Sequence, residues 1–192
     1  MPTSTLRDLT QRFANAGRVE SILLRPARLA PMLSTTEVLV EPGRGLIGDR
    51  RSATLRTGEL AQKREVTLFQ AEHLPVVAAL LGLPSLDPAR LRRNLVVSGI
   101  NLLSMRSLFP DVRLQWQLGD EVILEITGTC EPCSLMEAEL GEGGYNAMRG
   151  HGGVTARVVA GGTHRVGDSI RLRAADQAGR NPSTDRYRSP VS

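Results

Sequence analysis

Two cysteines lie three residues apart in the segment 129–134 (TCEPCS), and the 192 residues contain no others. A zinc site needs about four ligands, but there is no second cysteine pair and the three histidines are scattered. A thioredoxin-like redox pair is expected in a βαβ context, which the sequence does not show. The third interpretation is a single working cysteine, Cys133. All three interpretations stay open on the residues alone.

Cys133 has the surroundings expected of a reactive thiol. It follows a proline at the end of a predicted strand and precedes a predicted helix over 134–140. Unpaired N–H groups at such a position favour a thiolate, as do nearby arginines, while Glu131 opposes them. A Pro-Cys pair in a polar loop is not a core pattern, whereas Cys130 fits a buried, inert position. We therefore predict that Cys133 is the chemical centre of the chain.

Arginine- and glycine-rich loops accompany the cysteines. Lys63 is the only lysine, so 24 − 1 = 23 of the basic residues are arginine. A GC-rich genome would produce the same bias, but arginine also forms two-pronged bonds to carboxylate and phosphate. Backbone N–H groups in glycine-rich loops add to such anion sites, although no Walker sequence is present. The candidate anion-binding residues in these loops are Arg50, Arg92, Asn94, Arg149 and His151.

Short strands separated by glycine turns must position these loops. Alternating residues predict strands over 18–25, 37–40, 64–69, 94–98, 112–118, 121–127, 154–159 and 169–173. Helices are predicted over 70–81 and 134–140, with a brief helical turn after Asp87-Pro88. Without a regular βαβ alternation, a doubly wound parallel sheet is disfavoured. The pattern favours a mainly β (α+β) fold: a closed or partly closed β-barrel with a few short peripheral helices.

The organisation along the chain is simple. Residues 1–16 carry Leu6, Leu9 and Phe13 at helical spacing and predict an N-terminal helical extension. Residues 17–173 form one domain, which is long enough to bury a core. Because aromatic residues make up only 3%, that core must be aliphatic. Residues 174–192 are polar without periodicity and predict a disordered tail.

The composition also argues against some classes of binding partner. The net charge of +4 is modest and aromatic and basic residues do not interleave, so we expect no nucleic-acid partner. No apolar run approaches the roughly 20 residues of a membrane span, so we expect no membrane partner. The N-terminus lacks an apolar signal core, and two cysteines do not make a secreted disulfide framework. The expected location is the cytoplasm.

The order of several motifs resembles one family. The resemblance covers roughly residues 17–173, and its motifs follow in the order Gly48-Asp49-Arg50, 64–68 (REVTL) with 71–74 (AEHL), 94–102 (NLVVSGINL), Leu118-Gly119-Asp120, 126–128 (ITG) before Pro132-Cys133, and Gly161-Gly162 before Val166-Gly167-Asp168. This order is similar to that of the MOSC domain, named for the C-terminal domain of molybdenum cofactor sulfurase. The resemblance implies a MOSC-type β-barrel in which Cys133 is the functional cysteine.

The resemblance also implies functions and ligands. In the family this cysteine either carries sulfur as a persulfide or ligates molybdenum of a pterin cofactor, so Cys133 is the expected catalytic residue and metal ligand. An Arg-x-Asn before a strand helps some members bind the cofactor, which corresponds to Arg92 and Asn94. Some members reduce N-hydroxylated compounds. Soft thiolate suits molybdenum, and the pterin phosphate needs arginines and backbone donors.

Three functions follow as hypotheses. The leading one is a protein that binds the molybdenum cofactor through Cys133 and reduces N-hydroxylated small molecules. No flavin, haem or iron–sulfur motif is present, so such a reductase depends on a partner electron donor. The second is a sulfur carrier that takes sulfur from a donor protein and holds a Cys133 persulfide for cofactor or metal–sulfur cluster assembly. The third is a non-catalytic ligand-binding module.

Overall fold

Seven strands close into a mixed β-barrel in the computed structural model, which describes residues 4–58 and 62–173. The order around the barrel is β11-β7-β8-β9-β5-β6-β1, and pairing of β1 with β11 closes it. The barrel strands are β1 (Gly17–Leu24), β5 (Val66–Gln70), β6 (Leu95–Ser98), β7 (Gln115–Leu118), β8 (Val122–Thr129), β9 (Val154–Ala160) and β11 (Ser169–Leu172). The predicted tail, 174–192, lies outside the described residues.

The barrel interior is aliphatic, as the composition predicts, apart from one tryptophan. The first half of β1 alternates buried and exposed residues, and β7 alternates buried and partly buried ones, as expected when every second side chain of a strand faces the core. Trp116 is fully buried and its indole N–H donates to the Met105 carbonyl over 2.9 Å. This bond satisfies the one polar atom that the ring would otherwise bury without a partner.

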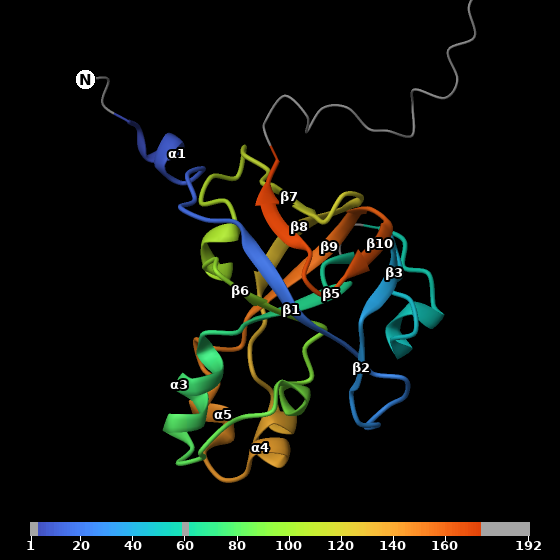
Figure 1. Ribbon diagram of the computed structural model, residues 1–192, viewed down its shortest axis with the longest axis vertical. Helices are drawn as coiled ribbons and strands as arrows, with labels where there is room; N and C mark the ends of the chain where they lie inside the picture. Colours follow the sequence, from blue (N-terminus) through green and yellow to red (C-terminus); the bar gives the residue numbers. More distant parts are fainter. Residues whose placement is uncertain (1–3, 59–61, 174–192) are drawn as a thin grey trace, which may run out of the picture.

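Short helices cover one end of the barrel (Figure 1). They are α3 (His73–Leu80), α4 (Ser134–Leu140) and α5 (Gly144–Ala147), together with the 3-10 turn η2 (Pro88–Leu91). Their apolar faces form a second core around Phe69, Leu91, Met136 and Met148. The predicted helix over 134–140 is confirmed, and that over 70–81 begins three residues later than expected. This helical layer carries the segment that follows Cys133.

One pair of neighbouring strands is parallel. β5 and β6 pair in parallel and are joined through α3 and η2, so a single βαβ unit exists within an otherwise antiparallel barrel. The sequence shows no regular βαβ alternation because this unit occurs only once. Cys130 and Cys133 lie outside it, between β8 and α4.

A small second sheet extends from the barrel. It contains β10 (Gly162–Arg165), β3 (Glu37–Glu41) and β4 (Gly45–Leu46). The sequence does not predict β10, because Gly161-Gly162 is typical of a turn between two strands. It also does not predict β4 and β2 (Leu33–Thr35), which pairs with β1 at its end, since strands of two or three residues are too short to show a period.

The N-terminal extension is helical only over α1 (Leu6–Leu9), which is much shorter than the predicted segment. Thr5 and Asp8 form a reciprocal capping box that starts the helix. Leu6 and Leu9 are 61% and 51% exposed, so the amphipathic face that their spacing predicts is not packed into the core. Two remaining 3-10 turns are η1 (Arg50–Ala53) and η3 (Leu102–Met105).

His164 on β10 makes the stability of the fold dependent on pH. Its side chain is fully buried, and burial lowers the pKa of His164, while the Asp168 carboxylate, 3.0 Å away, offsets part of this shift. A depressed pKa stabilises the fold above the unfolded value of about 6.5, and this contribution is lost as the pH falls below it.

We therefore expect the urea midpoint to fall between pH 7.5 and 5.5, and His164→Gln to flatten this dependence. His73→Gln is the comparison, because burial also lowers the pKa of the half-buried His73 and a smaller flattening is expected there. A slope that His164→Gln leaves unchanged would contradict this assignment.

Candidate functional site

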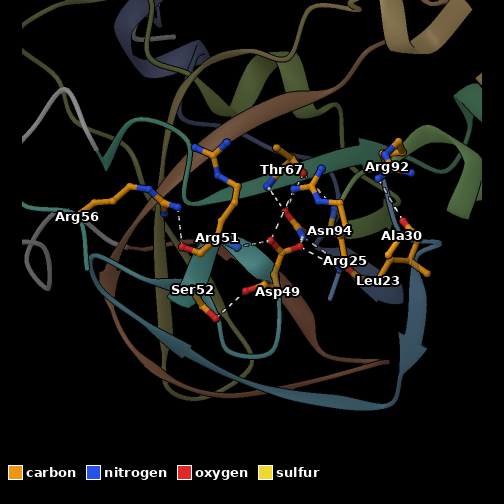
Figure 2. Close-up of polar contacts among 10 residues, drawn as sticks. All are labelled: Leu23, Arg25, Ala30, Asp49, Arg51, Ser52, Arg56, Thr67, Arg92 and Asn94. Atoms are coloured by element: carbon orange, nitrogen blue, oxygen red, sulfur yellow. Dashed lines mark hydrogen bonds and ion pairs between the residues drawn. The ribbon is translucent and has the colours of Figure 1, made fainter. Parts of the chain in front are cut away.

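A buried carboxylate, Asp49, organises one end of the barrel (Figure 2). Asp49 is 5% exposed and caps η1 by accepting the Arg51 N–H over 2.9 Å. Its other oxygen accepts the Arg25 N–H over 3.1 Å and the Asn94 amide over 3.2 Å. The Arg25 guanidinium lies 3.6 Å away and supplies the opposite charge. A buried carboxylate needs such partners, so the loop 48–51 is fixed to the end of β1 and the start of β6.

Asn94 is a central part of this network. Its amide oxygen accepts the Thr67 N–H over 3.2 Å and the Thr67 hydroxyl over 2.9 Å. Its amide nitrogen donates to the Leu23 carbonyl over 3.3 Å as well as to Asp49. The side chain therefore joins β1, β5 and the start of β6. Because these bonds occupy the amide, Asn94 holds neighbouring residues in place, and its direct contact with a cofactor stays a prediction.

Four arginines line one cavity of about 290 Å³ beside this network. The lining consists of Arg25, Arg28, Leu29, Arg50, Arg92 and Leu135. Within the part of the chain that the structure describes, the exposed guanidinium groups of Arg28 and Arg50 have no hydrogen-bond or carboxylate partner. Leu135 belongs to α4, the helix that begins directly after Cys133. The structure thus brings two predicted residues, Arg50 and Arg92, together beside the cysteine segment.

The backbone is strained at the same cavity. Leu29 and Arg92 have φ of 62° and 57°, and they are the two non-glycine residues with positive φ among those described. Such conformations cost of order 1–3 kcal/mol and concentrate at functional sites. The Arg92 side chain is held by Glu139 of α4 at 3.0 Å and by the Ala30 carbonyl at 3.2 Å. Arg92 therefore connects the cavity to α4.

The charge of this region is strongly positive. Burial lowers the pKa of Arg25, and the Asp49 carboxylate opposes this while Arg50 and Arg92 add to it. Burial likewise lowers the pKa of Arg51, and Arg56, Arg64, Arg25 and Arg50 lower it further. Neighbouring arginines destabilise the charged forms of Arg25 and Arg51, so an anion that enters the cavity would relieve this repulsion.

The two cysteines differ in accessibility. Cys133 is exposed and occupies the N-cap position of α4, where its carbonyl accepts the Met136 N–H over 2.8 Å. Cys130 is 1% exposed, and its sulfur accepts a hydrogen bond from the Arg64 guanidinium over 3.1 Å. The thiol of Cys133 is accessible to a ligand, whereas the thiol of Cys130 is buried.

Arg93 is not among the predicted cofactor-binding residues, although it stands between two of them, Arg92 and Asn94. Its buried guanidinium donates to three carbonyls: Gly152 over 2.8 Å, Leu91 over 2.9 Å and Cys130 over 3.3 Å. Burial lowers the pKa of Arg93, while both thiols act in the opposite direction. Arg93 therefore joins the cysteine segment to the loop 148–153 and adds positive charge near both sulfurs. Its position beside Arg92 and Asn94 was the available signal.

Arg149 and His151 lie on the glycine-rich loop 148–153. Arg149 is exposed. The ring of His151 packs edge-on against that of His73, with centroids 4.8 Å apart. Burial and His151 lower the pKa of His73, whereas Glu72 opposes this. Neither Arg149 nor His151 is among the residues that line the arginine cavity, so their predicted cofactor contacts stay predictions.

The available side chains also limit which metal ion the protein could bind. No group of three or more His, Cys, Asp and Glu among the described residues is placed to hold a metal ion, so the zinc interpretation gains no support. A molybdenum pterin needs few protein ligands, because the pterin supplies most of them, and a single exposed thiolate suits this requirement. In the same described ranges, no helix combines the length and apolarity needed to cross a membrane.

Comparisons with known proteins agree with this architecture. The family model of the MOSC domain matches residues 55–171. The chain therefore belongs to the MOSC domain family, which is associated with the molybdenum cofactor. The barrel extends beyond the matched residues, because β1 begins at Gly17. The comparison with curated proteins gives no match.

Solved structures share the fold at low sequence identity. The YuaD protein from Bacillus subtilis superposes with a TM-score of 0.65 at 19% identity, covering 81% of this chain and 94% of YuaD. YiiM from Geobacillus stearothermophilus has a TM-score of 0.59 at 13% identity, covering 82% and 75%. YiiM from Escherichia coli has a TM-score of 0.57 at 16% identity, covering 82% and 70%. These likenesses confirm the predicted MOSC-type barrel.

Gly152 provides a test of how the cysteine segment is held. A Cβ at Gly152 would overlap with the Cys130 carbonyl oxygen, so Gly152→Ala must displace the loop from Arg93. We expect a loss of roughly 1–3 kcal/mol in unfolding free energy and faster alkylation of Cys130, measured by peptide mass spectrometry.

Gly128→Ala is the matched control, because its Cβ would make only an ordinary 3.7 Å contact with Thr155. Equal effects of the two substitutions would argue against close packing at Gly152 as the cause.

Proposed function

We propose that this protein binds the molybdenum cofactor, with the Cys133 thiolate as the metal ligand and the arginine cavity as the site of the cofactor's phosphate. The observation that carries the proposal is the position of the cavity: four arginines line it together with Leu135, two residues after Cys133. A phosphate and a soft metal are the two groups of this cofactor that need arginine and thiolate.

The residues of the cavity have separate tasks in this proposal. Arg28 and Arg50 are free to donate to phosphate oxygens. Arg25 and Arg92 are held by Asp49 and Glu139, so they contribute charge in a fixed position. Arg93 places positive charge near both sulfur atoms, and Arg64 donates a hydrogen bond to the sulfur of Cys130.

The proposed reaction is the reduction of N-hydroxylated small molecules. An N–OH group gains two electrons and two protons and is converted to N–H and water. The bound cofactor would supply the two-electron chemistry, and a separate protein would deliver the electrons. The protein's part is to hold the metal through Cys133 at an exposed position, where a small substrate can approach.

A second candidate function is a sulfur carrier. The exposure of Cys133 favours it as well, because a donor protein must reach this sulfur to load a persulfide. A carrier needs the thiolate but not the arginine cavity. The two functions therefore differ in their dependence on Arg28 and Arg50.

Substitution of each cysteine tests the role of Cys133 in this proposal. In protein purified from a molybdenum-replete host, Cys133→Ser should remove at least about 90% of the bound molybdenum or persulfide, because a hydroxyl is a poor soft-metal ligand and cannot carry sulfur. Cys130→Ser should retain most of it. Elemental analysis and persulfide mass spectrometry give the two contents, and thermal unfolding verifies that both variants fold. Full metal and sulfur content in Cys133→Ser would refute the central role of this residue.

Substitution of two arginines tests the role of the arginine cavity. Arg28→Gln and Arg50→Gln should each weaken cofactor retention about 10-fold, since a charged hydrogen bond contributes roughly 1.5–3 kcal/mol. Arg165→Gln is the control: Arg165 is exposed and pairs with Glu37 on the small sheet. The measurement is the molybdenum-to-protein ratio after dialysis. Unchanged retention in both cavity variants, combined with normal persulfide loading, would favour the sulfur carrier.

A further inference from the structure

A second concave site lies away from the cysteine segment. This cavity of about 540 Å³ is bounded by α1 and the chain that follows it, by the turn after β6, and by η3 with the next loop. Figure 1 shows α1 at one end of the molecule and α3, α4 and α5 at the other. The volume falls within the range of small-molecule sites, roughly 300–1,000 Å³.

The walls of this N-terminal cavity are largely apolar and face solvent. They include Leu9, Phe13, Ile100, Leu103 and Leu108. Leu9, Leu103 and Leu108 are 51%, 47% and 70% exposed. Single exposed leucines are ordinary, but several around one hollow mark a surface that gains free energy when it is covered.

The charged side chains that line the cavity are all positive. Arg12 and Arg106 line it, and no acidic residue is among the lining residues. Hydrogen bonds from Thr5 lower the pKa of Asp8, and Arg12 lies close enough to that carboxyl to add a small effect in the same direction. The Arg106 guanidinium has no hydrogen-bond or carboxylate partner in the described part of the chain. Arg106 is therefore the lining cation that has no carboxylate near it, and we take it as the partner of an anionic ligand.

Fixed contacts hold the two sides of the cavity together. Arg7 of α1 forms a two-pronged pair with Asp111 at 2.8 and 3.1 Å. The same guanidinium lies 4.3 Å from the ring centre of Phe109. On the inner side, the Phe13 ring packs edge-on against Trp116 with centroids 4.8 Å apart. These contacts connect the segments on both sides of the cavity, and a site shaped before the ligand enters has a lower entropic cost of binding.

We propose that this cavity binds a small organic acid with an apolar body, such as a medium-chain carboxylate. The alkyl part would cover the exposed leucines, and the carboxylate would pair with Arg106. Charge complementarity selects an anion over a neutral ligand of the same shape. This site is independent of Cys133 and of molybdenum.

Trp116 provides a direct measurement, because it is the only tryptophan and contacts a wall of the cavity through Phe13. The full chain is titrated with decanoate below its micellar concentration while tryptophan fluorescence is followed, and decanol serves as the neutral probe of equal length. We expect saturable binding of decanoate. Arg106→Gln should weaken it about 10-fold and leave decanol binding unchanged. Leu103→Asp should abolish the binding of both probes.

Two control variants distinguish binding in this cavity from binding elsewhere on the protein. Arg165→Gln and Cys133→Ser should bind decanoate like the parent protein. Absence of saturable binding, or equal decanoate affinity in Arg106→Gln, would overturn the proposal. A stable dimer in light scattering that Leu9→Asp converts to monomer would also overturn it, because a second copy would then occupy the cavity.

Discussion

The need to satisfy one buried carboxylate governs the end of the barrel where the candidate site lies. Asp49 is surrounded by donors from three places in the chain: Arg25 after β1, Arg51 in η1 and Asn94 before β6. Removing the Arg25 guanidinium, which lies 3.6 Å from Asp49, would leave the buried carboxylate without its opposite charge, which typically costs several kcal/mol. Arg25 lies close to Asp49 in space and Arg50 follows it in the sequence. The network that stabilises the fold therefore also brings these arginines together. Folding and the proposed recognition of an anion therefore depend on one set of contacts.

Positive charge extends from the arginine cavity toward the cysteine segment. Arg51 lies near Arg25, Arg50 and Arg64, which together lower its pKa after burial, and Arg64 contacts the sulfur of Cys130. Arg93 continues this arrangement toward Cys133. A ligand with an anionic group at one end and a soft metal at the other would match this distribution, and the cofactor of the proposed function has both. Leu29 and Arg92, the two non-glycine residues with positive φ among those described, both line this cavity, and such strain concentrates at functional sites.

The sequence predicted most barrel strands and the fold class, because alternation and glycine turns are local signals that survive in the folded chain. It missed β10 because its first residue, Gly162, belongs to a diglycine that usually marks a turn. It selected Arg92 and Asn94 but not Arg93, since only the folded chain shows which of three neighbouring side chains points toward Cys130. The exposed thiol of Cys133 and the buried one of Cys130 were anticipated from the proline and the polar loop. The cavity between Arg28, Arg50 and Arg92 depends on contacts across distant segments, which no local pattern encodes.

The closure of the barrel has a consequence for the synthesis of the protein. β1 pairs with β6 and also with β11, through Gly17 opposite Ile170 and Arg18 opposite Ser169. While the chain is still being translated, the edge of β1 that will receive β11 has no partner, and the barrel core remains open to water. Residues up to about 172 must leave the ribosome before β11 can cover this edge. Pairing across such a sequence separation is slow, so the two residues at the start of β1 stay unpaired on this edge and the barrel stays open until β11 is in place.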